Sequence, residues 1–203
     1  MRKRTTSSAL LGLAMTLGMA TATHAICDPY PPLCAQVGVY ADAECFSCNL
    51  VAPYGQWATF YIAASYNGGD GITGAELKVV GFPQEWYRIV VPNAGASVSL
   101  GDPLGDVGAN IAFPIAHDEP CLHLYRVDIV PLTEAADIRL DVTRRTPPSN
   151  PTFECPIIFP FCVPCYTAIC AASVGMTING TGDCTVPVAK STWGSIKQLY
   201  SSR

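Results

Sequence analysis

The residues of this chain that could do chemistry are its ten cysteines and one short segment that combines histidine with acidic residues. Cys45-Phe46-Ser47-Cys48 and Cys162-Val163-Pro164-Cys165 have the spacing of redox or zinc motifs. A redox pair needs a thiolate stabilised by a helix N-terminus, and neither pair opens a helix between two strands. Two such pairs could together bind zinc, but thiols in an oxidising compartment form disulfides by default. We therefore expect structural disulfides from Cys27, Cys34, Cys45, Cys48, Cys121, Cys155, Cys162, Cys165, Cys170 and Cys184.

The spacing of the cysteines leaves their connectivity open. Four lie near the start of the chain, Cys121 stands alone, and five crowd the last third. Because five is odd, complete pairing requires at least one bridge from the last group to Cys121 or to the early group.

His117, Glu119 and His123 are weak candidates for metal ligands. Imidazole and carboxylate groups could hold a transition metal or activate water if they converged in space. The alternative is a solvated loop over residues 117–120, a bridged Cys121 and a strand that carries His123. We favour this alternative, and expect no metal, no cofactor and no catalytic residue. No serine lies in a Gly-x-Ser-x-Gly turn, which argues against a serine hydrolase.

Trp86 and Tyr87, shortly after Pro83, are the pair of aromatic residues that we expect to be exposed, if any are. Exposed rings could stack on sugars, whereas buried rings would fill the core. We favour core packing and keep sugar binding as the alternative. Trp57 and Trp193 are weaker candidates of the same kind.

The first 25 residues have the three parts of a cleavable export signal. Arg2, Lys3 and Arg4 form a basic start, residues 9–19 are apolar, and small residues precede a cut after Ala25. The apolar stretch is shorter than the roughly 20 residues of a membrane-spanning helix. We therefore expect residues 26–203 to be secreted or extracytoplasmic, in the periplasm, on the envelope surface or outside the cell, with no transmembrane anchor.

Without this signal the chain keeps 9 basic and 16 acidic residues, a net charge of −7. No basic cluster is larger than Arg144-Arg145. Proteins that bind nucleic acid have clustered lysine and arginine, so we expect no nucleic-acid partner. The remaining 178 residues suit one domain.

Alternation of apolar and polar residues with period two is the main pattern of the chain. In residues 136–143, Ile138, Leu140 and Val142 alternate with polar residues. Similar stretches are 60–64, 75–79, 109–115 and 122–131, with shorter candidates at 37–40, 87–91, 97–100 and 174–178. Turn-forming residues separate them, and residues 26–190 show no sustained helical pattern. We predict an all-β fold, an immunoglobulin-like antiparallel β-sandwich, with a jelly roll as the alternative.

We place the sandwich in residues 26–145, because the proline-rich residues 146–151 cannot continue a strand ladder. Residues 146–190 are predicted to form an extension held by disulfides, irregular over 152–172, with a returning strand near 174–178. Residues 191–203 are predicted to form an amphipathic helix, with Trp193, Ile196 and Tyr200 on one face. This helix would pack on the sandwich or serve as a docking or sorting tag.

Five segments carry a resemblance to known proteins: Val37–Asp42, Gly71–Glu76, Gly108–Pro114, Cys184–Val188 and Thr192–Tyr200. Through them the chain resembles a group of uncharacterised secreted bacterial proteins with a single immunoglobulin-like β-sandwich and the ending Thr-Trp-Gly-x-Ile-Lys-x-Leu-Tyr. The resemblance covers nearly the whole chain after the signal. It implies an extracytoplasmic location and a sandwich, but no reaction and no catalytic residue.

Together these features predict a secreted, non-catalytic structural or binding module of the bacterial envelope or extracellular space. Its partner would be a protein or a carbohydrate. The alternatives are a carbohydrate-binding module that uses Trp86 and Tyr87, and a secreted metal-dependent hydrolase that uses His117, Glu119 and His123.

Overall fold

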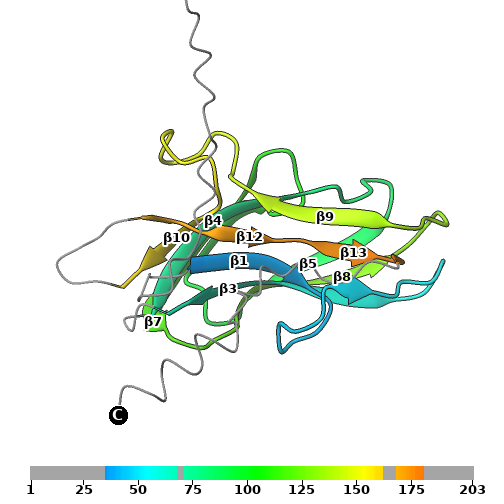
Figure 1. Cartoon of the computed structure of the whole chain (residues 1–203), viewed down its shortest axis with the longest axis horizontal. Helices are drawn as coiled ribbons and strands as arrows, with labels where there is room; N and C mark the ends of the chain where they lie inside the picture. The colour runs from blue at the N-terminus through cyan, green and yellow to red at the C-terminus, as the bar shows by residue number, and fades with distance from the viewer. Residues whose placement is uncertain (1–34, 68–70, 162–167, 181–203) are drawn as a thin grey trace, which may run out of the picture.

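The computed structural model describes residues 35–67, 71–161 and 168–180, which form two packed β-sheets without a helix (Figure 1). The first sheet has five strands in the order β12-β1-β3-β8-β5. Strands β1, β3, β8 and β5 are antiparallel neighbours, and β12 runs parallel to β1. Their bounds are β12 Ala172–Val174, β1 Ala35–Tyr40, β3 Ala58–Tyr66, β8 Leu122–Val130 and β5 Tyr87–Pro92.

The second sheet has eight strands, and β4 (Ile72–Val80) is its most connected member. β4 pairs with β7 and, through successive parts of its length, with β10 and then β9. β6 extends the sheet from β7, β11 extends it from β10, and β13 and β2 extend it from β9. The bounds are β2 Asn49–Leu50, β6 Val98–Asp102, β7 Gly108–His117, β9 Ile138–Thr143, β10 Ile157–Pro160, β11 Ile169–Cys170 and β13 Met176–Ile178.

The core lies between the inner faces of the two sheets. Phe60, Ile62, Leu77, Val127 and Ile129 are all fully buried there. They occupy alternate positions because successive side chains of a strand point to opposite faces of the sheet. Each buried side chain of this kind stabilises the fold by about 1.5–3 kcal/mol. The predicted all-β sandwich is confirmed.

The chain passes from the first sheet to the second at Gly175, between β12 and β13 (Figure 1). A Cβ atom on residue 175 would lie 2.5 Å from Asp141 Oδ1 and 2.9 Å from the backbone oxygen of Leu140. Only glycine lets the backbone approach β9 this closely. The crossing therefore depends on the residue type at position 175.

Residues 157–178 contribute strands to both sheets, so the sandwich continues past the boundary that we placed at residue 145. Ile157–Pro160, expected to be irregular, is strand β10. Ile157 and Ile158 are both fully buried, so the segment lacks the alternation of apolar and polar residues that predicts a strand. The flanking prolines also argue against a strand in the sequence. The returning strand expected near residues 174–178 forms as β13.

Some predictions concern residues outside the described ranges. These are the export signal, the C-terminal helix with Trp193, Ile196 and Tyr200, and the disulfides of Cys27, Cys34, Cys162, Cys165 and Cys184. Within the described ranges, no helix is both long enough and apolar enough to cross a membrane.

Candidate functional site

The outer face of the five-stranded sheet carries a group of exposed aromatic and aliphatic side chains. Trp57 is 61% exposed, Tyr87 is 52% exposed and Ile89 is 41% exposed. Tyr87 and Ile89 alternate along β5 and pair with Val130 and Asp128 of β8. Because the flanking residues of β8 face the core, Tyr87 and Ile89 point away from it. We call Trp57, Tyr61, Tyr87, Ile89, Arg126 and Asp128 the aromatic face.

The aromatic face combines apolar and charged groups in fixed positions. The rings of Trp57 and Tyr87 meet edge to face, with centroids 5.7 Å apart and an interplanar angle of 81°. Beside them, Arg126 Nη2 lies 3.0 Å from Asp128 Oδ2. Thr59 Oγ1 donates to Asp128 Oδ1 at 2.8 Å, which orients this carboxylate from the neighbouring strand. The surface is therefore ordered by its own contacts before any partner arrives.

Trp86 does not belong to this face, because it packs in the core, as we favoured, and not at the surface, as sugar binding would require. The indole is only 2% exposed and packs edge to face on Phe82 in the core. Its Nε1 donates to Thr133 Oγ1 at 2.9 Å. A turn in which Trp86 N donates to Pro83 O directs the ring inward. Tyr87 is exposed, although we favoured core packing for it, and its aromatic neighbour is Trp57.

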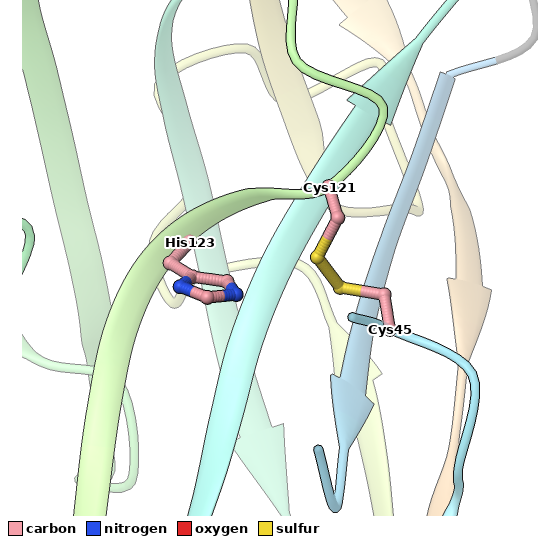
Figure 2. A group of neighbouring side chains, drawn as sticks. All are labelled: Cys45, Cys121 and His123. Carbon is pink, nitrogen blue, oxygen red and sulfur yellow. A yellow bond between two sulfur atoms is a disulfide. The ribbon is translucent and has the colours of Figure 1, made fainter. Parts of the chain in front are cut away.

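A loop of residues 41–48 covers the other end of the same outer face and is held there by a disulfide between Cys45 and Cys121 (Figure 2). Both cysteines pack against Tyr40, Ala63 and Val174, which form a small hydrophobic cluster separate from the main core. This loop closes one end of the sheet face.

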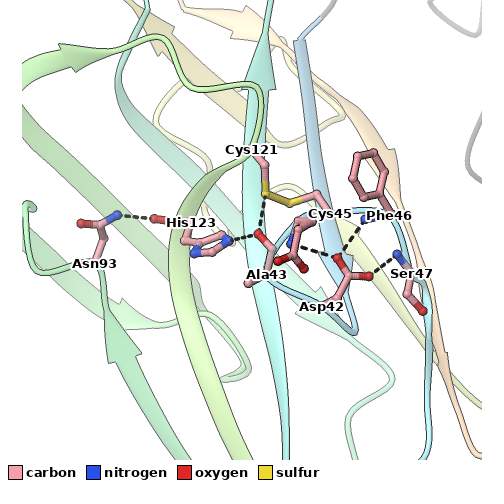
Figure 3. Close-up of a disulfide and its surroundings, with 9 residues drawn as sticks. Asp42, Ala43, Cys45, Phe46, Ser47, Asn93, Cys121 and His123 are labelled. Carbon is pink, nitrogen blue, oxygen red and sulfur yellow. Dashed lines mark hydrogen bonds between the residues drawn. A yellow bond between two sulfur atoms is a disulfide. The ribbon is translucent and has the colours of Figure 1, made fainter.

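Asp42 shapes the loop from within (Figure 3). Its Oδ1 accepts hydrogen bonds from the backbone of Glu44 at 2.9 Å and Phe46 at 3.1 Å, and its Oδ2 accepts one from Ser47. These bonds let Cys45 keep a positive φ of 62° and reach Cys121.

His123 is the third residue beside this disulfide, and the ligand atoms of Cys45, Cys121 and His123 all lie within 4.8 Å of one another (Figure 2). His123 Nε2 lies 2.6 Å from Ala43 O, which can only accept, so Nε2 carries the proton. Metal binding needs thiolates and an unprotonated ring nitrogen. With the sulfur atoms bonded to each other, the group acts as a structural clamp on the loop.

His117 and Glu119 meet each other but not His123. His117 Nδ1 lies 3.1 Å from Glu119 Oε1, and the imidazole packs on Phe113. Burial alone would raise the pKa of Glu119, but the hydrogen bond with His117 and a backbone hydrogen bond lower it below the ordinary value. His123 instead stacks on Tyr61, with ring centroids 4.7 Å apart. The trio expected for a hydrolase is therefore divided between two places.

The disulfides seen among the described residues are Cys45–Cys121 and Cys155–Cys170. Cys48 is buried and is also disulfide-bonded. Since Cys121 bonds to Cys45, complete pairing of the other cysteines requires a bridge from the last group to the early group.

Sequence reasoning missed two features of the surface. Ile89 was placed on a strand, but no local signal showed that its side of β5 faces solvent. Glu76 was expected on the polar side of a strand, and it is buried because the segment after β9 folds over it. Both depend on contacts between distant segments.

No protein-family model matches the chain, and a search of curated proteins gave no match. Solved structures do resemble it. The seventh type I cohesin of ScaB from Pseudobacteroides cellulosolvens superposes with a TM-score of 0.50 and 12% identity, over 75% of this chain and 96% of the cohesin. The sixth cohesin of scaffoldin B from Acetivibrio cellulolyticus, solved in complex with a Cel5 dockerin, gives 0.47 and 10%, over 72% and 98%. At such identities the likeness concerns the fold alone. Cohesin modules are jelly-roll sandwiches, the second of the two sandwich types expected from the sequence, and this chain shares their fold.

Proposed function

We propose that the protein is a non-catalytic binding module that acts outside the cytosol and recognises a protein partner through the aromatic face. The observation that carries the proposal is the group of Trp57, Tyr87 and Ile89, exposed together next to the Arg126–Asp128 ion pair. Protein interfaces are enriched in aromatic residues and arginine, and a few such residues supply most of the binding energy.

The fold and the disulfides support the same proposal. Cohesins, whose fold the chain shares, are non-catalytic modules that bind other proteins in extracellular complexes. The bridges Cys45–Cys121 and Cys155–Cys170 suit an oxidising compartment. A rigid sandwich whose loops are fixed by disulfides presents a preformed surface, which lowers the entropic cost of association.

The arrangement of the rings favours a protein over a carbohydrate. A sugar chain stacks on aromatic rings that lie flat and side by side at the surface. Trp57 and Tyr87 are nearly perpendicular, at 81°, so one ring presents its edge where the other presents its face. Perpendicular rings form a notch for a side chain better than a platform for a sugar.

A capture experiment with matched variants tests the proposal. The immobilised protein is exposed to culture fluid of the organism that encodes it, in parallel with a Trp57→Ala/Tyr87→Ala variant and an Ile115→Ala/Val107→Ala variant. The control pair removes exposed apolar side chains of the other sheet and its loops. We expect a protein retained by the wild type and the control but lost with the Trp57/Tyr87 variant.

Three results would contradict the proposal. The first is capture of the same protein in equal amounts by both variants, and the second is capture of nothing by the wild-type protein. The third is retardation of the wild-type protein in gels that contain a soluble polysaccharide, abolished by the Trp57/Tyr87 substitutions. The third result would make the aromatic face a carbohydrate site.

A further inference from the structure

A hollow of about 330 Å³ opens on the outer face of the second sheet, opposite to the aromatic face. Its floor is formed where Gly74 of β4 pairs with Ala112 of β7. Val98 of β6 and Phe159 of β10 rise beside this pair as apolar walls. Because residues 74 and 112 have almost no side chain, the floor stays low between the walls. The volume falls in the usual range of small-ligand sites.

Glu76 lines the hollow and is only 1% exposed. It points outward because its neighbours Ala75 and Leu77 belong to the core. The backbone N–H of Ser149 donates to Glu76 Oε1 at 2.8 Å. With its amide oriented to satisfy its neighbours, Asn110 donates to Glu76 Oε2 at 3.3 Å. The carboxylate is thus held by one neutral donor on each oxygen.

No cation neutralises Glu76 within the described part of the chain, where the five ion pairs all involve other acidic residues. A buried carboxylate is costly unless it is paired or fully hydrogen-bonded. Each carboxylate oxygen has two lone pairs, so each oxygen of Glu76 can still accept one more bond. The hollow therefore offers an unpaired negative charge next to apolar walls.

We propose that this hollow binds the side chain of a lysine from a protein partner. Its four methylene groups would lie against Val98 and Phe159, and its ammonium group would pair with Glu76. Lysine combines these two parts, an apolar stem and a compact charge. Arginine fits less well, since its guanidinium group is a broad planar fork, whereas the ammonium group of lysine is a compact charge at the end of a flexible stem.

The site is separate from the proposed function, because it lies on the other sheet and uses none of the residues of the aromatic face. A partner that reached both faces would be held at two points. Either site could exist without the other, so each has its own test.

The test is a titration of the ¹⁵N-labelled, disulfide-bonded protein with the peptide acetyl-Gly-Lys-Gly-amide, followed by NMR. We expect saturable shifts of the amide signals of Gly74, Glu76 and Ala112. The same peptide with norleucine keeps the stem without the charge and should bind at least about tenfold more weakly, as should the arginine peptide. The Trp57→Ala/Tyr87→Ala variant should bind the lysine peptide like the wild type.

Variants of the hollow complete the experiment. Glu76→Gln keeps an acceptor for Ser149 but removes the charge, and it should lose binding by at least about tenfold. Ala112→Leu fills the floor, leaves Glu76 in place and should also lose binding. Glu134→Gln removes one exposed carboxylate and should bind normally. Absent shifts, equal binding of norleucine, or unchanged binding by a folded Glu76→Gln protein would each overturn the proposal.

Discussion

Cys45 and Cys121 are 76 residues apart in the sequence, and their disulfide ties the 41–48 loop to the beginning of β8. The 41–48 loop connects β1 of the first sheet to β2 of the second. The disulfide holds it directly over the outer face of β1 and β3. Its stabilising effect should follow from the length of chain that it closes, because a longer closed segment restricts the unfolded chain more strongly.

The first prediction compares the two disulfides. Replacing both Cys45 and Cys121 by alanine should lower the free energy of unfolding by about 4.5 kcal/mol, on the entropic account of a closed loop of this length. Replacing both Cys155 and Cys170, which are 15 residues apart, should cost about 3 kcal/mol. Urea unfolding of the two variants and the wild type measures the difference. A larger loss for the Cys155/Cys170 variant would contradict the reasoning.

The second prediction concerns Asn179, which has a φ of 54° and ties three segments together. Its Oδ1 accepts from Ala52 N at 2.8 Å, while its Nδ2 donates to Ala52 O at 2.9 Å and to Ala135 O at 3.1 Å. Asn179→Ala should destabilise the protein by about 3–4 kcal/mol, since it loses these bonds and strains the backbone.

Asn179→Gly is the matched control, because glycine tolerates the positive φ and loses only the side-chain bonds. It should cost about 1 kcal/mol less than Asn179→Ala. Thermal unfolding of both variants separates the two contributions. Equal stability of the two variants would show that the backbone conformation contributes nothing.

The third prediction concerns the crossing at Gly175. Gly175→Ala places a methyl group against Asp141 and the backbone of Leu140, so we expect a loss of about 2–3 kcal/mol. Gly55→Ala is the comparison, because Gly55 has a positive φ of 70° but nothing lies within 4 Å of the added Cβ. That variant should lose only about 1 kcal/mol. Chemical denaturation measures both losses of stability. A Gly175→Ala variant more stable than Gly55→Ala would contradict the prediction.

The fourth prediction concerns alkaline pH. Burial raises the pKa of Tyr40, which packs in the small cluster under the 41–48 loop. A raised pKa in the folded state means that its contribution is complete below the ordinary tyrosine pKa near 10, and is lost as the pH rises through the folded value. The free energy of unfolding of the wild type should therefore fall above about pH 10, and that of the Tyr40→Phe variant should fall less.

Burial also raises the pKa of Tyr125, although a hydrogen bond with Ser99 opposes this, so Tyr40→Phe should remove only part of the alkaline loss. Unfolding measured between pH 8 and pH 11, together with the ultraviolet absorbance of tyrosinate, tests both groups. Identical pH profiles for the wild type and Tyr40→Phe would show that Tyr40 does not contribute.

Local patterns predicted most of the sandwich. β8 and β9 were predicted almost to their ends, since polar residues such as Arg126 and Asp141 mark the outer face at every second position. β10 was missed because the side chains of Ile157 and Ile158, which point to opposite faces of the strand, are both buried. The sequence therefore shows no alternation of apolar and polar residues there. This segment forms a strand because it pairs with β4, and no local sequence pattern indicates that pairing.

The candidate sites were harder to predict than the strands. Core packing was favoured for both Trp86 and Tyr87, and it holds only for Trp86, which a turn from Pro83 and a hydrogen bond to Thr133, 47 residues away, direct into the core. The stretch from His117 to His123 looked compact in sequence. His117 ends β7 in the second sheet and His123 lies at the start of β8 in the first, so closeness in sequence did not bring these two imidazoles together.

The two parallel pairings, β1 with β12 and β2 with β13, join the first described strands to the last ones. Neither pairing can form until residues 172–178 are available. Structures dominated by such distant contacts fold slowly. During synthesis the emerging polypeptide should therefore remain incompletely folded, and it should acquire its final form only after the last strands become available.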